Sequence, residues 1–229
     1  MRYLITPSLY GSYIWYKDTD FSKIYEDMNK ATEMEQKAYQ DWLNTLNKVR
    51  TPTTEAQQLG INFENAIQEM SENIEGVKLE DEKLVFDNEA DFLLTSLLSE
   101  SEAKAAYEIT KKVVGGFWQE TLKKEVGNYL LYGRADVIKR NYIYDIKRVN
   151  QYDVGKYKKS IQHLVYMECA NIDNFEYLIA DSSGNTYAEY YAREPQKVLI
   201  GKIDDMVSFI KSVPEFSKPF NELWSAKDE

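Results

Sequence analysis

The chain has 229 residues, of which 43% are hydrophobic, and it carries a formal net charge of −10. This length suffices for one sizeable hydrophobic core, so we expect a single domain over residues 1–229 rather than two independent ones. The sequence has no long apolar run, no secretory leader pattern and one cysteine, Cys169, which excludes an internal disulfide and any four-cysteine zinc or iron–sulfur site.

The first part of the chain has the spacing of amphipathic helices. Apolar residues recur at near-helical intervals from Phe21 to Arg50, which predicts one or two helices in a helical N-terminal extension over residues 1–53. The Thr-Pro-Thr break at 51–53 ends this pattern. Further helices are predicted from Thr54 to Met70 and from Asp91 to Lys112.

After Gly115 and Gly116 the pattern changes to short runs that are typical of β-strands. We expect a tight hairpin at residues 139–141 and one helix, from Val154 to Ala170, between the third strand and the fourth. The five predicted strands are Phe117–Glu125, Asn128–Ile138, Tyr142–Val149, Phe175–Ala180 and Thr186–Tyr191.

The end of the chain is predicted to be one amphipathic helix and a tail, over residues 194–229. Pro195 opens this helix, because proline suits a first helical position. The order of elements predicts an α/β fold with a core at about 54–193, in which helices flank a central mixed sheet.

Two carboxylates and a lysine meet on the predicted hairpin. Asp145 and Lys147 are two residues apart in a strand, so their side chains lie on the same face. The hairpin brings Asp136 of the preceding strand beside them. Because a buried, unpaired carboxylate costs several kcal/mol, these acids indicate a bound cation.

The chemistry of these groups suits a divalent metal ion. Mg²⁺ prefers oxygen ligands, and Asp136, Asp145 and the backbone carbonyl of Ile146 would supply three. Lys147 would then position or deprotonate the attacking water during hydrolysis of a phosphodiester. The alternative is a surface ion pair between Asp145 and Lys147, which is the commoner meaning of two such residues on a strand.

Basic residues concentrate near this group. Residues 139–159 carry seven lysines and arginines against two acids, although the whole chain is acidic. Arg148, Lys156 and Lys158 are therefore candidates for phosphate binding. The solvated start of a helix explains Lys156 and Lys158 equally well.

Four short motifs, which follow along the chain in the order typical of the family, resemble those of the PD-(D/E)XK nuclease superfamily, especially its RecB-like and lambda-exonuclease-like branches. GRADVI and DIK, with Asp136, Asp145 and Lys147, resemble motifs II and III. GINFENAIQE resembles motif I and places Glu64 at its acidic position, and SIQHLVYM resembles the QxxxY motif. The resemblance covers about residues 60–180.

The resemblance implies a restriction-endonuclease-like αβββαβ core that uses Mg²⁺ or Mn²⁺ and no iron–sulfur cluster. Glu64 would be a third acid of the metal site, although it could equally be a polar residue at the edge of an apolar helix face. Gln162 and Tyr166 would hold a phosphate or a base near the metal. Glu120 is a further candidate acid, ranked below Glu64, and His163 is expected to be structural.

The implied function is a metal-dependent deoxyribonuclease, chiefly an exonuclease in recombination, repair or DNA end processing, of the phage or mobile-element type. Its partner would be single- or double-stranded DNA, with a recombination protein and a homo-oligomer left open. A restriction-type endonuclease is the nearest alternative. A non-catalytic binding protein that retains the nuclease fold is the other. We expect a cytoplasmic location without membrane contact, in the host cytoplasm if a phage encodes the protein.

Overall fold

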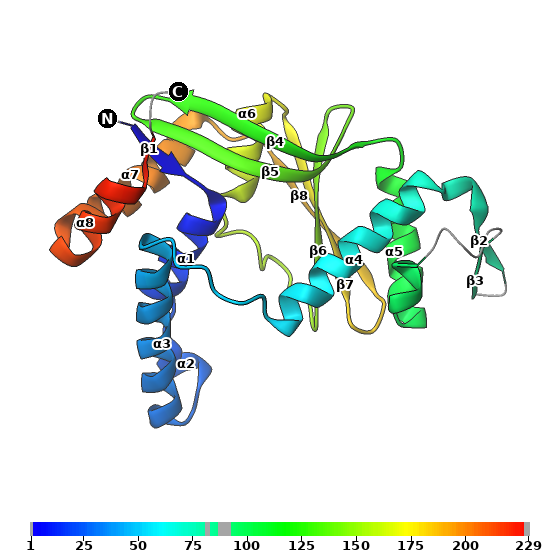
Figure 1. Ribbon diagram of the computed structural model, residues 1–229, viewed down its shortest axis with the longest axis horizontal. Helices are drawn as coiled ribbons and strands as arrows, with labels where there is room; N and C mark the ends of the chain where they lie inside the picture. Colours follow the sequence, from blue (N-terminus) through cyan, green and yellow to red (C-terminus); the bar gives the residue numbers. More distant parts are fainter. Residues whose placement is uncertain (1, 81–82, 87–92, 227–229) are drawn as a thin grey trace.

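The computed structural model describes residues 2–80, 83–86 and 93–226, and it has the predicted α/β architecture: a central mixed sheet with helices on both faces (Figure 1). The strands of this seven-stranded sheet are β1 (Arg2–Ile5), β4 (Phe117–Val126), β5 (Tyr129–Lys139), β6 (Tyr142–Val149), β7 (Asn174–Asp181), β8 (Thr186–Ala192) and β9 (Ser225–Ala226). A second, two-stranded sheet joins β2 (Val77–Glu80) and β3 (Lys83–Phe86).

The helices divide between the two faces of the sheet. On one face α4 packs against β6 and α5 against β7, and on the other α6 packs against β4 and β5 (Figure 1). The helices are α1 (Pro7–Asp18), α2 (Phe21–Ile24), α3 (Met28–Leu46), α4 (Glu55–Glu72), α5 (Glu100–Val113), α6 (Gln162–Ala170), α7 (Gln196–Ser212) and α8 (Pro214–Leu223), with short 3₁₀ helices at Ile74–Gly76 and Thr95–Leu97.

The predicted αβββαβ order is confirmed by α4, β4, β5, β6, α6 and β7, which follow in this order along the chain, with β2, β3 and α5 inserted between α4 and β4. The predicted strands match β4 to β8 closely. Alternating side chains identified them correctly because each buries one face of the sheet against helices.

The sequence predicted a helical N-terminal extension, but this segment also contains a strand. Residues 2–5 form β1, which pairs in parallel with β5 and antiparallel with β9, so both ends of the described chain lie side by side in the sheet (Figure 1). Tyr3, Ile5 and Leu9 are buried in the same core cluster as Tyr166 of α6. This strand was missed because a four-residue run carries almost no periodicity.

The helix predicted from Asp91 to Lys112 begins later, at Glu100. Ser99 and Glu102 form a capping box that fixes this start. The preceding residues form a turn and a 3₁₀ helix, because the Glu69 carboxylate accepts hydrogen bonds from the backbone N–H groups of Leu94 and Thr95. Residues 91 and 92 of the prediction lie outside the described residues.

The helix predicted from Val154 to Ala170 is also shorter, because α6 begins at Gln162 and residues 154–159 form turns. The Glu189 carboxylate on β8 accepts hydrogen bonds from the Tyr152 hydroxyl (2.6 Å) and the Gly155 N–H (3.0 Å). These bonds hold the segment against the sheet. At the C-terminus, Pro195 is the N-cap of α7 rather than its first residue, and α8 is a separate helix.

A divergence between β5 and β6 creates the space for the site. The two strands pair only from Val137 to Lys139 with Tyr142 to Tyr144. Beyond those pairs β5 continues along β4 and β1, whereas β6 continues along β7. Figure 1 shows the β4–β5 hairpin crossing the direction of β6 and β7. The sheet is therefore forked at this point.

Candidate active site

Asp136 and Asp145 are the first residues past the last β5–β6 pair, one on each strand of the fork. The backbone N–H of Ile146 donates to Asp136 Oδ2 at 2.8 Å, which links the two strands where their ladder has ended. The sequence prediction that these two acids lie side by side is consistent with this contact. The fork leaves the space between them free of β-ladder hydrogen bonds.

Asp145 is fully buried, and both of its carboxylate oxygens are directed at polar groups. Gln162 Nε2 donates to Oδ1 at 2.6 Å, and the Lys147 ammonium forms an ion pair with Oδ2. Apart from this ion pair, Oδ2 has no hydrogen-bond partner among the described residues. The Lys147 side chain is 30% exposed, so it joins the buried acid to solvent.

Glu64 approaches the group from α4, which packs against β6. Its side chain is half-buried, and Gln119 Nε2 of β4 donates a hydrogen bond to Glu64 Oε1. Asp145, Lys147 and Arg134 all act electrostatically on the Glu64 carboxylate. The motif-I acid is thus near the fork, as the resemblance implies.

Burial raises the pKa of all three acids, and the charge of Asp145 raises those of Asp136 and Glu64 further. Burial, followed by the charge of Asp145, raises the pKa of Asp136 well above its usual range and raises that of Glu64. Burial also raises the pKa of Asp145, against the opposing effect of Lys147. For Lys147, burial would lower the pKa, but the charges of Asp145 and Asp136 outweigh it and raise the pKa. The site therefore holds excess negative charge that attracts protons or cations.

Gln162 connects the acids to a group of tyrosines. Its Nε2 atom also lies 3.2 Å from the Tyr166 hydroxyl, and the Tyr177 hydroxyl donates to Gln162 Oε1 at 3.4 Å. Tyr157 stacks on Tyr177 with ring centroids 4.5 Å apart. The tyrosines close one side of the site and fix the orientation of the glutamine amide.

Tyr166 lies directly over Gly133 of β5. A Cβ atom at Gly133 would be 2.2 Å from Tyr166 Cε1, so this position has no room for a side chain. Burial raises the pKa of Tyr166 to about 12, and the hydroxyl therefore stays protonated. The glycine of the GRADVI motif thus permits the QxxxY tyrosine to pack against the strand.

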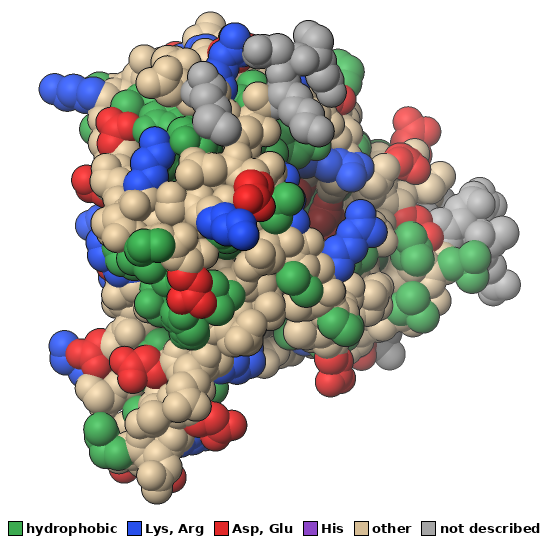
Figure 2. Space-filling view, turned by 60° about the vertical axis from the view of Figure 1, so that its left-hand side comes forward, with side chains coloured by type: hydrophobic (Ala, Val, Ile, Leu, Met, Phe, Trp, Pro, Cys, Tyr) green, Lys and Arg blue, Asp and Glu red, His purple; other side chains and the backbone are tan. Residues whose placement is uncertain are grey.

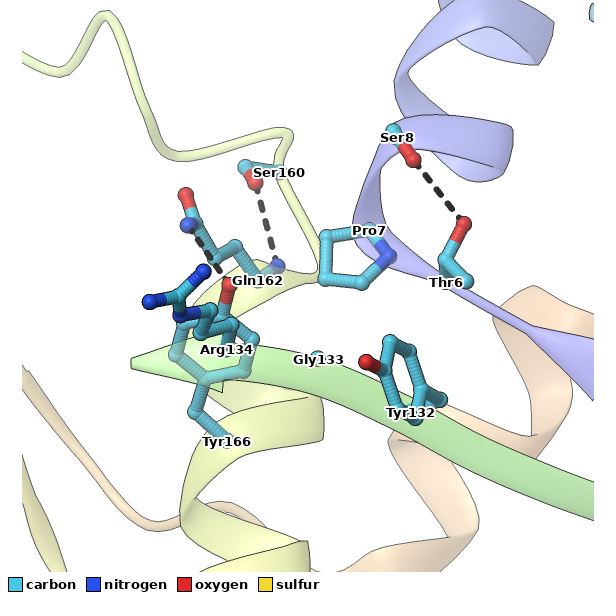
Figure 3. Close-up of a pocket in the computed structure, with 9 residues that line it drawn as sticks. All are labelled: Thr6, Pro7, Ser8, Tyr132, Gly133, Arg134, Ser160, Gln162 and Tyr166. Atoms are coloured by element: carbon cyan, nitrogen blue, oxygen red, sulfur yellow. Dashed lines mark hydrogen bonds between the residues drawn. The ribbon is translucent and has the colours of Figure 1, made fainter. Parts of the chain in front are cut away.

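An open pocket of about 420 Å³ adjoins this network (Figure 3). Arg134, Gln162 and Tyr166 line it beside the acids, and the start of α1 lines the other side. Thr6 is the N-cap of α1, and its hydroxyl accepts from the Leu9 N–H at 3.1 Å. An arginine and a helix N-terminus both favour an anion. Figure 2 shows a hollow on this protein in which acidic atoms are recessed between basic side chains.

Two of the sequence candidates lie apart from this group. The geometry counts against the prediction that Arg148 binds phosphate, because Arg148 faces α5 and donates to Glu102 Oε1 at 3.0 Å with both Nε and Nη2. Adjacent residues of a strand point to opposite faces, so Arg148 points away from Lys147. Glu120 is exposed and pairs across with Ala135, while its neighbour Gln119 makes the contact with Glu64.

The other basic candidates are on the surface segment that precedes α6. Lys156 and Lys158 are exposed, and Tyr157 between them faces the site. His163 is buried against Tyr191, with ring centroids 4.1 Å apart, and burial lowers its pKa to about 4. A neutral, enclosed imidazole agrees with the predicted structural role.

The donor set suits a hard cation, although it is not assembled as a closed cage. Carboxylate oxygens and a backbone carbonyl are the ligands that Mg²⁺ prefers, and the buried Oδ2 of Asp145 has no partner among the described residues other than the Lys147 ammonium. Among the described residues, no three acidic, histidine or cysteine side chains converge tightly enough to form a ready ligand set. Glu64 is held by Gln119 and Asp136 by Ile146.

Sequence reasoning missed Gln119 and Arg134 as members of the site. Arg134 Nε donates to the Gln119 carbonyl at 3.2 Å, which places the arginine at the pocket wall. Arg134 stands two residues before Asp136 in the GRADVI motif, so its basic charge beside an acid was a usable signal. Gln119 carries no such signal, because its role depends on the local backbone.

Comparisons with known proteins add only distant structural likenesses. No family model and no curated protein matches the chain. An alkaline exonuclease from Laribacter hongkongensis has 11% identity and a TM-score of 0.47, over 96% of this chain and 90% of its own. A putative exonuclease from Eubacterium rectale has 14% identity and a TM-score of 0.45, over 96% of this chain and 82% of its own. A phage-related exonuclease from Haemophilus somnus has 16% identity and a TM-score of 0.32, over 79% and 93%.

Proposed function

We propose that this protein is a divalent-metal-dependent deoxyribonuclease that degrades linear DNA from its ends. The observation that carries the proposal is the fork: Asp136 and Asp145 stand on its two strands, with Lys147 and Gln162 bound to Asp145. The motifs that resemble PD-(D/E)XK nucleases supply these same residues. The chemistry of the group therefore agrees with the resemblance at each position.

Asp136, Asp145 and the Ile146 carbonyl would hold the metal, with Glu64 as a further carboxylate or as a holder of metal-bound water. A bound Mg²⁺ supplies charge neutralisation at the phosphate and a water of lowered pKa. The raised pKa values of the three acids support this assignment, since burial disfavours their charged forms and a bound cation favours them.

Lys147 would act on the attacking water and on the charge that develops at the phosphate. Asp145 anchors its ammonium group beside the acids, while its partial exposure leaves it accessible to substrate. The carboxylates keep it protonated, which favours electrostatic stabilisation of the phosphate over proton abstraction. Of the two roles expected from the sequence, positioning the water and deprotonating it, the first is therefore favoured for Lys147.

The pocket beside the acids favours an exonuclease over a restriction-type endonuclease. It places Arg134, Gln162 and the start of α1 around a volume of about 420 Å³, which suits a terminal phosphate. An endonuclease has no need of a pocket for a strand end. Lys156 and Lys158, exposed on the adjoining segment, would contact the DNA backbone.

A non-catalytic binding protein is the second candidate. The acidic balance of the whole chain favours it, with a formal net charge of −10. Against it, buried acids that repel one another weaken a fold, and a protein without catalytic use for them gains nothing from their retention.

None of the described helices is long and apolar enough to cross a membrane.

The test is a comparison of linear duplex DNA with a covalently closed circle of the same sequence, each incubated with the protein and Mg²⁺. We expect the linear DNA to be degraded and the circle to persist, with no cleavage of either in EDTA. Cleavage of the circle would establish the endonuclease alternative. Binding without cleavage in both Mg²⁺ and Mn²⁺ would establish the non-catalytic one.

A further inference from the structure

Gln119 has an unusual backbone for its place in the fold. Four non-glycine residues of the described chain have a positive φ, and Gln119 is one of them, at 54°. The other three are Lys48 just past α3, Arg140 in the β5–β6 turn and Asn171 at the end of α6. Those are places where left-handed residues are common, but Gln119 lies inside β4.

The strained residue stands across from a proposed metal ligand. The β4–β5 ladder pairs Trp118 with Val137 and Glu120 with Ala135, so Gln119 lies opposite Asp136, and this one pair is missing from the register. The interruption coincides with the place where β5 separates from β6. The distortion of β4 and the fork of the sheet are therefore at the same level.

The conformation of Gln119 lets it contact both sides of the site. Its side-chain amide donates to Glu64 Oε1 on α4, and its carbonyl accepts from Arg134 Nε at the pocket. A regular strand residue directs its side chain and its carbonyl according to the pleat alone. Strained conformations persist where the surroundings require them, and they cluster at functional sites.

We propose that Gln119 is a positioning residue for the metal site: its left-handed backbone directs its amide onto Glu64 and fixes that carboxylate toward the ion, while its carbonyl holds Arg134. This inference rests on the proposed function and adds a residue to it. Gln119 acts through Glu64 rather than on the substrate.

Gln119→Gly separates the two parts of this role. Glycine adopts a positive φ without strain, so the backbone and the Arg134 contact are kept while the amide is lost. We expect about a tenfold weaker Mn²⁺ affinity of the full-length protein without DNA, as for loss of a group that orients a metal ligand. The melting temperature should be unchanged or higher. Electron paramagnetic resonance of free Mn²⁺ measures the affinity directly.

Two further variants make the test specific. Lys48→Gly is the matched control, because Lys48 has a φ of 51° far from the fork and should leave Mn²⁺ affinity unchanged. Glu64→Gln should weaken Mn²⁺ binding, and adding Gln119→Gly to it should cause no further loss. A second loss in the double variant would overturn the claim that Gln119 acts through Glu64.

The outcomes for Gln119 and for the proposed function are distinguishable. If Asp145→Asn weakens Mn²⁺ binding but Gln119→Gly binds it like the wild type, the inference about Gln119 is wrong and the metal site stands. If Asp145→Asn binds Mn²⁺ as tightly as the wild type, the proposed metal site is wrong, and the inference falls with it.

Discussion

Gln162 Nε2 donates a 2.6 Å hydrogen bond to Asp145 Oδ1, which joins the first residue of α6 to the buried acid of β6. The same amide contacts Tyr166 and Tyr177, so it is held from three sides. This bond fixes which Asp145 oxygen faces Lys147. The glutamine of the QxxxY motif can therefore orient a metal ligand as well as contact substrate.

Replacing Gln162 with alanine should reduce nuclease activity by about 10- to 100-fold, the usual loss when a partner of a metal ligand is removed. The fold should persist, because α6 is anchored by Val165 and Met167 in the core. Initial rates across a Mg²⁺ titration measure the effect. Gln58→Ala, on the exposed start of α4, is the control and should retain full activity.

Gly133→Ala should displace the Tyr166 ring and weaken both activity and stability. The added Cβ would overlap Tyr166 Cε1, and overpacking of this kind costs about 1–3 kcal/mol of unfolding free energy. Urea denaturation and a rate assay measure the two effects. In contrast, Gly201→Ala on α7 has open space and should stabilise the helix by about 1 kcal/mol. Equal behaviour of the two variants would contradict the packing described for Tyr166.

Asp136→Asn should stabilise the metal-free protein increasingly as the pH rises. The folded-state pKa of Asp136 is raised, so the folded protein binds its proton more tightly than the unfolded chain does. The wild type therefore loses stability as the pH rises from the ordinary aspartate pKa of about 3.9 through the raised value. The asparagine variant has no such loss, while its activity should fall on the order of 100-fold.

Urea unfolding in EDTA at a series of pH values measures this difference between variant and wild type. The two proteins should be closest at the acid end of the series and furthest apart at neutral pH. A difference that shrinks as the pH rises would show that Asp136 is stabilised as a carboxylate, contrary to the electrostatics of the fork.

The two arginines near the site should behave differently. Arg134→Ala should weaken DNA binding for every sequence and reduce the slope of log affinity against log salt by about 1, because one phosphate contact is lost. Arg148→Ala should leave that slope unchanged and lower the unfolding free energy by about 2 kcal/mol, since Arg148 bonds to Glu102 within the fold. A reduced salt slope for Arg148→Ala, with an unchanged slope for Arg134→Ala, would instead support phosphate binding by Arg148.

The sequence predicted the strands, and the position of the acids on them, because these signals are local. Asp145 and Lys147 share a face by simple alternation, and the tight turn at Arg140 and Asn141, one residue shorter than predicted, places Asp136 beside them. Alternation also places Arg148 on the opposite face of the strand. The prediction that it binds phosphate rested on its charge and did not use this geometry.

The features that the sequence did not predict depend on contacts between distant residues. The parallel pairing of β1 with β5 joins Tyr3 to Tyr129, and no local pattern signals it. The turns before α6 depend on Glu189, and the late start of α5 depends in part on Glu69. The left-handed Gln119 has no signature at all, because glutamine is not a residue that favours this conformation.

The most direct test of the central claim is the rate at which end-labelled linear duplex DNA is hydrolysed by wild type, Asp145→Asn and Lys147→Ala, with Mg²⁺ and with EDTA. We expect Mg²⁺-dependent release of nucleotides by the wild type and loss of that activity in both variants, with their folds intact by circular dichroism. Undiminished Mg²⁺-dependent hydrolysis by either variant would contradict the assignment of the fork as the active site.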